Sequence, residues 1–317
     1  MTSKAIYPVL LAGLLMGLAC PQAGHSGPLR EALAKKNRRA PVSPEEAELR
    51  DNDGEKTARA DLPPGTRTLT DLAYGDDPQQ RLDVYLPKEP KAAPLILMVH
   101  GGAWMFGDKD SAKVVVNKAA NWLPKGYVLA SVNYRMSKSP DPLQQADDVA
   151  RALAYAQAHC KSWGCEPART LLMGHSAGAH LVSLLTADPA IAARQGAGPW
   201  LGTVSLDSAM MNVPEVMGTA HYRMYDRVFK KERKFWEAAS PFHRLKAAAK
   251  PILLVCSLKR KDSCPQARAF AEKAVSLGGK AEVLPVELGH GPVNGELGLP
   301  GKYTAAVEAF LRGLGLP

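Results

Sequence analysis

The sequence predicts an α/β fold: a three-layer α/β/α sandwich with a mostly parallel central sheet. Short, near-continuous runs of aliphatic side chains recur along residues 66–317, as is typical of parallel strands that are covered on both faces. Segments with helical periodicity separate these runs, and such alternation indicates βαβ units. Roughly 250 residues arranged in this way form a single domain.

The individual elements follow from the same patterns. Residues 81–86 (RLDVYL) alternate apolar and polar side chains, which predicts a half-exposed edge strand. The buried strands are expected at 95–99, 128–132, 170–173, 202–206, 251–256 and 281–286. Helices are expected at 112–122, 142–159, 177–186, 265–277 and 302–314.

The alternation lapses between Leu206 and Pro251, where methionine and aromatic side chains accumulate. This stretch, between the sixth and seventh strands, is too long for an ordinary loop. We expect a small helical insertion there that caps or walls a pocket, and a longer surface crossover is the alternative.

The N-terminal residues 1–20 are predicted to be a signal peptide. Lys4 precedes an apolar run from Ile6 to Ala19, which is shorter than the roughly 20 residues that span a membrane. A buried N-terminal helix is the alternative. Cys20 loosely resembles the cysteine of a lipoprotein signal, so a membrane tether through Cys20 stands beside a plain secreted or periplasmic form. Residues 21–65 have few large apolar side chains and are expected to form a flexible linker before the domain at 66–317.

The chain carries a formal net charge of +9, with basic runs that include 230–234 and 259–261. Aromatic residues do not interleave with these runs, and no nucleic-acid-binding motif is present. We therefore interpret the runs as solvated surface and expect no nucleic-acid partner.

Four cysteines besides Cys20 lie in two close pairs, and four cysteines allow three connectivities. Local pairing, Cys160–Cys165 and Cys256–Cys264, is the simplest of them. A zinc site is the competing interpretation, but neither spacing is C-x-x-C and no histidines cluster nearby. Two disulfides in turn favour an oxidising compartment.

The sharpest chemical signal is the turn from Gly174 to Gly178 (GHSAG). An apolar strand precedes it and a helical pattern follows, which is the setting that a G-x-S-x-G nucleophile turn requires. We predict that Ser176 is a nucleophile at the carboxyl edge of the sheet.

With this turn, the chain resembles the α/β-hydrolase superfamily. Within it, the chain is similar to the esterase/lipase group related to hormone-sensitive lipase and to bacterial feruloyl, acetyl-xylan and carboxyl esterases. The resemblance also rests on 82–87 (LDVYLP), 100–104 (HGGAW) and 133–135 (NYR). The HGG-x-W version is also similar to that of kynurenine formamidases. In the resembling family, Arg135 and an aspartate of the pair at 147–148 would hold the fold together near the active site.

An oxyanion hole is expected from two segments. The N–H of Ala177 follows the nucleophile, and Gly101 and Gly102 lie in a loop directly after an apolar strand, with Ala103 as a substitute. His100 is expected to brace this loop, and Trp104 to pack beneath it or line the pocket.

The base and the acid follow from the chain order of the fold, which is serine, acid, histidine. His290 alone among the histidines follows the last strand. Asp262 is the only carboxylate between the strand at 251–256 and the next helix, and its cationic neighbours would keep it ionised. Asp207, which ends the preceding strand, is the alternative acid. A Cys256–Cys264 bond would clamp the loop that carries Asp262.

These observations predict an exported serine carboxylic-ester hydrolase that acts on a small-molecule ester through an acyl-enzyme. Its triad would be Ser176, His290 and Asp262, and no metal or organic cofactor is implied. An aryl formamidase or peptidase of the same fold is the first alternative. A catalytically idle relative that serves as an envelope binding protein is the second.

Overall fold

The structure, a computed structural model, describes residues 57–317. The predicted signal peptide, Cys20 and most of the predicted linker lie outside the described residues. Among residues 57–317, no helix combines the length and apolar character needed to cross a membrane. The last predicted linker residues include a 3-10 helix, η1 (Ala58–Asp61), whose Ala58 is buried in the core that α3 (Ala112–Trp122) helps to form.

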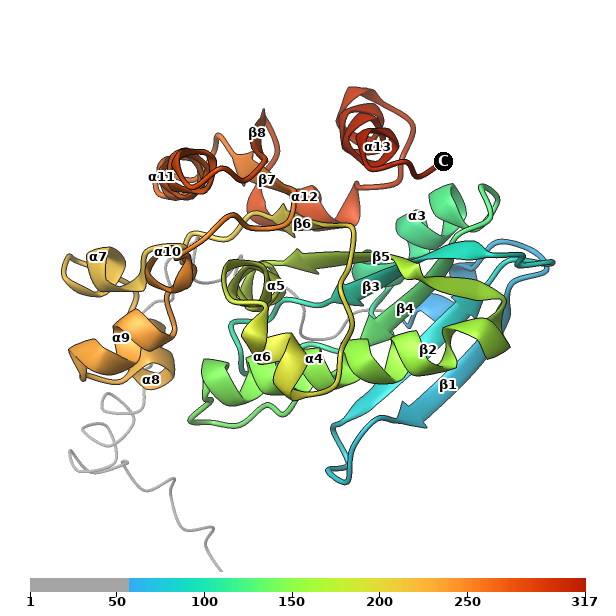
Figure 1. The fold of residues 1–317 in the computed structure, drawn as a ribbon, viewed down its shortest axis with the longest axis horizontal. Coiled ribbons are helices and arrows are strands. Elements are labelled where there is room, and N and C mark those ends of the chain that lie inside the picture. The colour runs from blue at the N-terminus through green and yellow to red at the C-terminus, as the bar shows by residue number, and fades with distance from the viewer. Residues whose placement is uncertain (1–56) are drawn as a thin grey trace, which may run out of the picture. The chain divides into compact units, whose positions relative to one another are not determined.

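Eight strands form one sheet in the order β1-β2-β4-β3-β5-β6-β7-β8 (Figure 1). The pairs β1–β2 and β2–β4 are antiparallel, and all other neighbours are parallel. The mostly parallel sheet is thus confirmed. The strands are β1 (Arg67–Ala73), β2 (Arg81–Leu86), β3 (Ala93–Val99), β4 (Val128–Val132), β5 (Cys165–His175), β6 (Gly202–Leu206), β7 (Ile252–Ser257) and β8 (Ala281–Val286).

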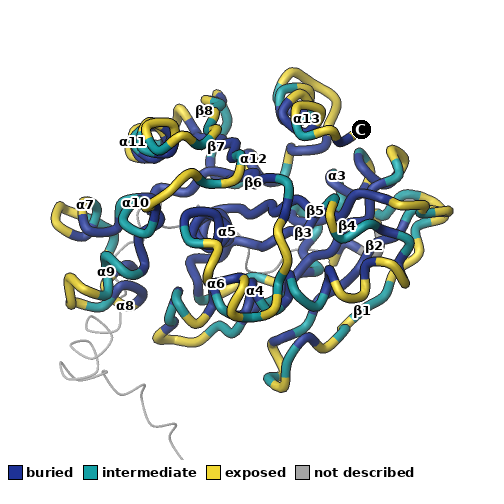
Figure 2. Tube along the Cα trace, viewed as in Figure 1, coloured by how far each residue is buried: buried dark blue, intermediate teal, exposed yellow. Residues whose placement is uncertain are grey.

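Helices cover both faces of the sheet (Figures 1 and 2). One core includes α3 and α13 (Lys302–Gly313), and the other includes α4 (Pro142–His159) and α5 (Ala177–Ala187). Along β3, Leu95 faces one core and Ile96 the other. This two-sided burial explains the unbroken apolar runs of the sequence. The remaining helices outside the insertion are η2 (Cys160–Trp163), α6 (Ala190–Arg194), α11 (Ser263–Ser276) and α12 (His290–Gly295).

The prediction that residues 81–86 form the edge strand is wrong. β1 pairs outside β2, and most of β2 is buried. Asp83, a polar residue of this alternating pattern, is fully buried and accepts from the N–H of Asp71 (2.7 Å) and from Nζ of Lys109 (3.1 Å). β1 itself is largely exposed, so its apolar pattern is too weak to identify it as a strand.

The connection from β6 to β7 is a small helical insertion, as predicted. It contains α7 (Val213–Met217), α8 (Arg223–Phe229), α9 (Arg233–Ala238) and α10 (Pro241–Arg244). Tyr225 and Phe229 of α8 meet the ring of Trp104 edge to face. The insertion therefore packs on the loop that follows β3.

Both close cysteine pairs form disulfides, Cys160–Cys165 and Cys256–Cys264. The first joins the end of the α4 segment to the start of β5, and the second joins β7 to the first turn of α11. The local pairing predicted from the spacing is confirmed. Within residues 57–317, no group of three histidine, cysteine, aspartate or glutamate side chains is placed to hold a metal ion.

The predicted arginine–aspartate pair joins Arg135 to Asp148 of α4. Arg135 Nη2 donates to Asp148 Oδ1 (2.6 Å) and Nε to Oδ2 (2.8 Å), and the side-chain amide of Gln80 also donates to Oδ1 (2.7 Å). Asp148 is fully buried. Its carboxylate therefore links α4 to the loop that follows β4 and to the loop that precedes β2.

Replacing Asp148 should destabilise the domain without a comparable effect on chemistry. Asp148→Ala leaves the buried amide of Gln80 and the partly exposed guanidinium of Arg135 without this acceptor, and it is expected to lower the free energy of unfolding by about 1–3 kcal/mol in urea titrations. Asp147→Ala is the matched control because the carboxylate of Asp147 is 41% exposed. It should change stability by less than about 0.5 kcal/mol. Equal stability of the two variants would contradict the structural role of Asp148.

Candidate active site

Ser176 lies in a sharp turn between β5 and α5. Its φ of +54° is a left-handed conformation that an L-residue adopts only when its surroundings impose it. A Cβ on Gly174 would lie 2.4 Å from the carbonyl oxygen of Gly178, and one on Gly178 would lie 2.2 Å from that of Val99. The two glycines of the motif are therefore needed because backbone segments touch at both positions. This close packing holds the serine in its strained conformation.

Three side chains from separate parts of the chain form a hydrogen-bonded series. The hydroxyl of Ser176 donates to Nε2 of His290 (2.8 Å), and Nδ1 of His290 donates to Oδ2 of Asp207 (2.6 Å). Ser176 is 8% exposed and His290 3%, whereas Asp207 is fully buried. The imidazole ring thus links the two groups: Nε2 bonds to the hydroxyl and Nδ1 to the carboxylate.

The prediction that Asp262 orients His290 is wrong, and the alternative, Asp207, occupies that position. Asp262 is exposed at the N-terminus of α11. Asp207 directly follows β6, and β6 lies beside β5 in the sheet. The backbone N–H of Ser176 even donates to the carbonyl of Leu206 (2.9 Å). An aspartate at the end of the strand next to the nucleophile strand is the signal that identifies this residue.

Asp207 has further donors, none of which was predicted from the sequence. The N–H of Ser257 (2.8 Å) and the hydroxyl of Ser263 donate to Oδ1, and Nη1 of Arg260 donates to Oδ2 (2.9 Å). Burial alone would raise the pKa of Asp207, but the hydrogen bond from His290 and the charge of Arg260 outweigh it and hold that pKa well below its usual range. The carboxylate is therefore ionised throughout the neutral range.

The loop after β3 lies directly against Ser176. A Cβ on Gly101 would stand 2.9 Å from the Cβ of Ser176. Gly102, Ala103 and Trp104 have φ values of +103°, +54° and +62°, so the chain turns tightly here. Ala103 lines the space beside Ser176. Ala177 begins α5 directly after Ser176, so its N–H is among the first of the helix, which have no partner within the helix.

Buried histidines brace this region, as was expected of His100. Its Nδ1 donates to the carbonyl of Gly101 (2.6 Å), and its ring stacks on Tyr134 at 4.6 Å. Nε2 of His175 donates to the carbonyl of His290 (2.9 Å). His180 donates to the carbonyl of Ala239 (2.7 Å) and accepts from the indole of Trp104 (3.3 Å). These rings fix the backbone around the series.

A cavity of about 660 Å³ lies between the helical insertion and the start of α11. Tyr225 and Arg260 line both this cavity and the small space at Ser176. The wall combines aromatic, charged and amide side chains, including Tyr222, Glu215 and Gln266. The insertion thus forms one wall of a pocket next to the serine.

Comparisons with known proteins show which families and enzymes this chain is similar to. A protein-family model described as BD-FAE matches residues 82–194. Esterase LipC of Mycobacterium tuberculosis (strain ATCC 25618 / H37Rv) is 30% identical over 244 residues, which cover 69% of this chain and 59% of LipC. The kynurenine formamidase of Danio rerio is 34% identical over 122 residues, which cover 38% of this chain and 39% of that protein. The chain thus spans less than two thirds of the length of these relatives.

Solved structures share the fold at low sequence identity. A truncated form of a carbohydrate esterase from gut microbiota has a TM-score of 0.69 at 19% identity, covering 82% of this chain and 99% of that chain. Esterase B from Lactobacillus Rhamnosis (HN001) has a TM-score of 0.65 at 17% identity, covering 90% of this chain and 93% of that chain. The chain therefore has the α/β-hydrolase fold.

The two aspartates can be separated by the reactivity of Ser176. Asp207→Asn removes the acceptor of the His290 Nδ1–H and should slow labelling of Ser176 by a fluorophosphonate probe about 10³- to 10⁴-fold. Asp262→Asn changes an exposed carboxylate and should label within about threefold of the wild-type rate. The reverse order of the two rates would return the role to Asp262.

The buried histidines also predict the response of stability to acid. Burial lowers the pKa of His180 to about 4, below the 6.5 of the unfolded chain. Between pH 6.5 and 4 the unfolded chain binds a proton that folded His180 does not, so the free energy of unfolding falls as the pH falls. This one group contributes about 3 kcal/mol over that window.

His180→Gln should therefore show a smaller loss of stability between pH 7 and pH 4.5 than the wild type in urea titrations. His159 is exposed, and His159→Gln serves as the control. It should lose as much stability between pH 7 and pH 4.5 as the wild type. If His180→Gln lost as much stability over this pH range as the wild type, the lowered pKa of buried His180 would be contradicted.

Proposed function

We propose that this chain, which has the α/β-hydrolase fold, is a serine carboxylic-ester hydrolase that works through a covalent acyl-enzyme. The single observation that carries this proposal is the hydrogen-bonded series Ser176–His290–Asp207. It supplies a nucleophile, a base in contact with it and a carboxylate that orients the base. Similarity to LipC and to the BD-FAE family model supports the same reaction class.

In the proposed mechanism, Ser176 Oγ attacks the ester carbonyl carbon while Nε2 of His290 takes its proton. The tetrahedral oxyanion is stabilised by the N–H of Ala177 and by N–H groups of Gly101 and Gly102, or Ala103 in place of one of them. The imidazolium donates its proton to the departing alkoxide, which leaves the acyl group on Ser176. Water then attacks the acyl-enzyme with His290 again as the base.

Asp207 has two tasks in this mechanism. Its hydrogen bond fixes His290 in the tautomer that presents an unprotonated Nε2 to the serine. Its negative charge, maintained by its buried donors, stabilises the imidazolium that forms during each proton transfer. No step calls on a metal or an organic cofactor.

The substrate is proposed to be a small ester that enters through the cavity beneath the insertion. Tyr222 and Tyr225 line this cavity, and Trp104 lines the small space at Ser176. A formamide is the second candidate, favoured by the similarity to the kynurenine formamidase of Danio rerio.

We propose in addition that the enzyme is exported. The disulfides Cys160–Cys165 and Cys256–Cys264 are typical of proteins that fold in an oxidising compartment. The predicted signal peptide and the tether through Cys20 belong to this proposal.

The decisive comparison is between wild-type protein and Ser176→Ala on p-nitrophenyl acetate, an aryl formamide and a peptide. The wild type should hydrolyse the ester fastest, and Ser176→Ala should lose about 10⁶-fold in kcat. Faster turnover of the formamide would assign the second candidate. A folded wild type that neither turns over substrate nor reacts with a fluorophosphonate would identify an idle relative.

Labelled protein in the envelope or secreted fraction of a bacterial host would support export, and label confined to the cytosol would contradict it.

A further inference from the structure

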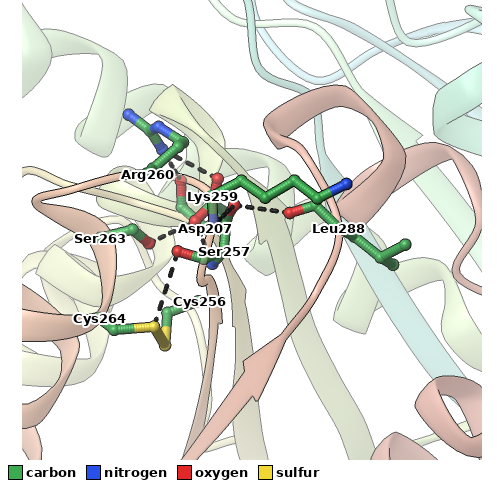
Figure 3. The surroundings of a disulfide bond; sticks show 8 residues. All are labelled: Asp207, Cys256, Ser257, Lys259, Arg260, Ser263, Cys264 and Leu288. Atoms are coloured by element: carbon green, nitrogen blue, oxygen red, sulfur yellow. Dashed lines mark hydrogen bonds and ion pairs between the residues drawn. A yellow bond between two sulfur atoms is a disulfide. The ribbon is translucent and has the colours of Figure 1, made fainter.

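The hydrogen-bond donors to the Asp207 carboxylate other than His290 come from a single loop. Ser257 supplies its backbone N–H, Arg260 its guanidinium and Ser263 its hydroxyl, and all three lie between Cys256 and Cys264 (Figure 3). The disulfide joins the two ends of this loop. The carboxylate is thus held by a segment of nine residues that is closed on itself.

The sheet explains why this loop can reach the carboxylate. β6 and β7 are parallel neighbours, so Asp207 at the end of β6 lies beside the loop that leaves β7. The N–H of Asp207 donates to the carbonyl of Val255 (2.8 Å), which fixes the two strand ends together. The loop that was expected to carry the acid carries its donors instead.

Arg260 is the most specific of these contacts. Its Nη1 donates to both the carbonyl (3.0 Å) and Oδ2 (2.9 Å) of Asp207, and lies 3.0 Å from Nδ1 of His290. Both nitrogens carry hydrogens, so they share Oδ2 as acceptor and do not bond to each other. Arg260 therefore fixes the oxygen that receives the histidine N–H.

The position of Arg260 is unusual for its sequence context. It lies between Lys259 and Lys261, both exposed, yet its own side chain is only 13% exposed. A buried guanidinium is tolerated when a carboxylate compensates its charge. The basic run at 259–261 is thus not a uniformly solvated surface, contrary to the interpretation from the sequence.

We propose that the loop from Cys256 to Cys264 is the positioning element of the triad, with Arg260 holding Asp207 Oδ2 toward His290 and the disulfide keeping the loop closed. This proposal rests on the proposed function, since it assigns Arg260 a task in that mechanism. Arg260 acts through Asp207 and is a positioning residue.

The first test separates positioning from simple stability. Arg260→Gln should lower kcat for p-nitrophenyl acetate about 10- to 100-fold while KM stays within about twofold. Arg260→Lys, which keeps the charge, should recover part of the loss. Lys259→Gln removes a charge from the same loop and should leave kcat and KM unchanged. Wild-type kcat in Arg260→Gln would overturn the proposal.

Proton NMR of His290 provides a second readout, which does not depend on turnover. The Nδ1–H of His290, bonded to a buried carboxylate, should give a low-field proton resonance in the wild type, and His290→Gln identifies it. Arg260→Gln should shift or remove this resonance, while Lys259→Gln should retain it. An unchanged resonance in Arg260→Gln would overturn the proposal. If the wild type shows no activity, the proposed function fails, and this resonance still decides the role of Arg260.

The two disulfides provide a second test that does not require Arg260→Gln to fold. The paired substitutions Cys256→Ser/Cys264→Ser and Cys160→Ser/Cys165→Ser each remove one short-range disulfide. At a temperature where near-ultraviolet circular dichroism shows both to be folded, only the first pair should lower kcat, by about tenfold. Equal kcat in the two pairs would overturn the role of the closed loop.

Discussion

The candidate site depends on one buried carboxylate. Asp207 is fully buried, and a buried charge persists only where paired charges and hydrogen bonds replace its lost solvation. Here the compensation comes from His290 on one side and from the loop after β7 on the other. Because these donors come from different segments, the carboxylate joins the end of β6, the end of β7 and the start of α12. The imidazole that reaches Ser176 is fixed by this junction.

The strained serine is the complementary constraint. Ser176 keeps a φ of +54° because Gly174 and Gly178 allow β5, α5 and the end of β3 to touch. The same contacts bring the loop at Gly101 against the serine. The packing that strains the nucleophile thus also places Gly101, one of the residues proposed to stabilise the oxyanion, beside it. Two independent constraints, one steric and one electrostatic, therefore meet at His290 and Ser176.

Much of this fold follows from local patterns. The strands at 128–132, 202–206 and 281–286 have the bounds expected from their apolar runs, and the nucleophile turn has the predicted strand–turn–helix setting. The edge strand β1 was missed because an exposed strand bears little apolar signal. The pairing of residues 81–86 with a further strand depends on contacts that local periodicity does not contain.

The aspartate that orients His290 shows even more clearly that local sequence does not reveal tertiary contacts. The sequence favours Asp262 because it follows the strand at 251–256 and has cationic neighbours, with Asp207 as the alternative. The choice depends on which strand end lies beside Ser176, and that is a property of the sheet order. Arg260 likewise lies in a basic run that the sequence assigns to solvated surface. Local sequence does not reveal its burial, because that burial depends on a carboxylate more than fifty residues earlier in the sequence. Residue type predicted the chemistry, whereas tertiary neighbours decided which residues take part.

Trapping the covalent intermediate would show directly whether Ser176 is the nucleophile. Wild-type protein mixed with excess p-nitrophenyl acetate and quenched in acid within the first turnovers is digested and analysed by mass spectrometry. We expect a burst of p-nitrophenol and an acetyl group on the peptide that contains Ser176. Steady turnover with that peptide unmodified, or with the acetyl group on another residue, would contradict it.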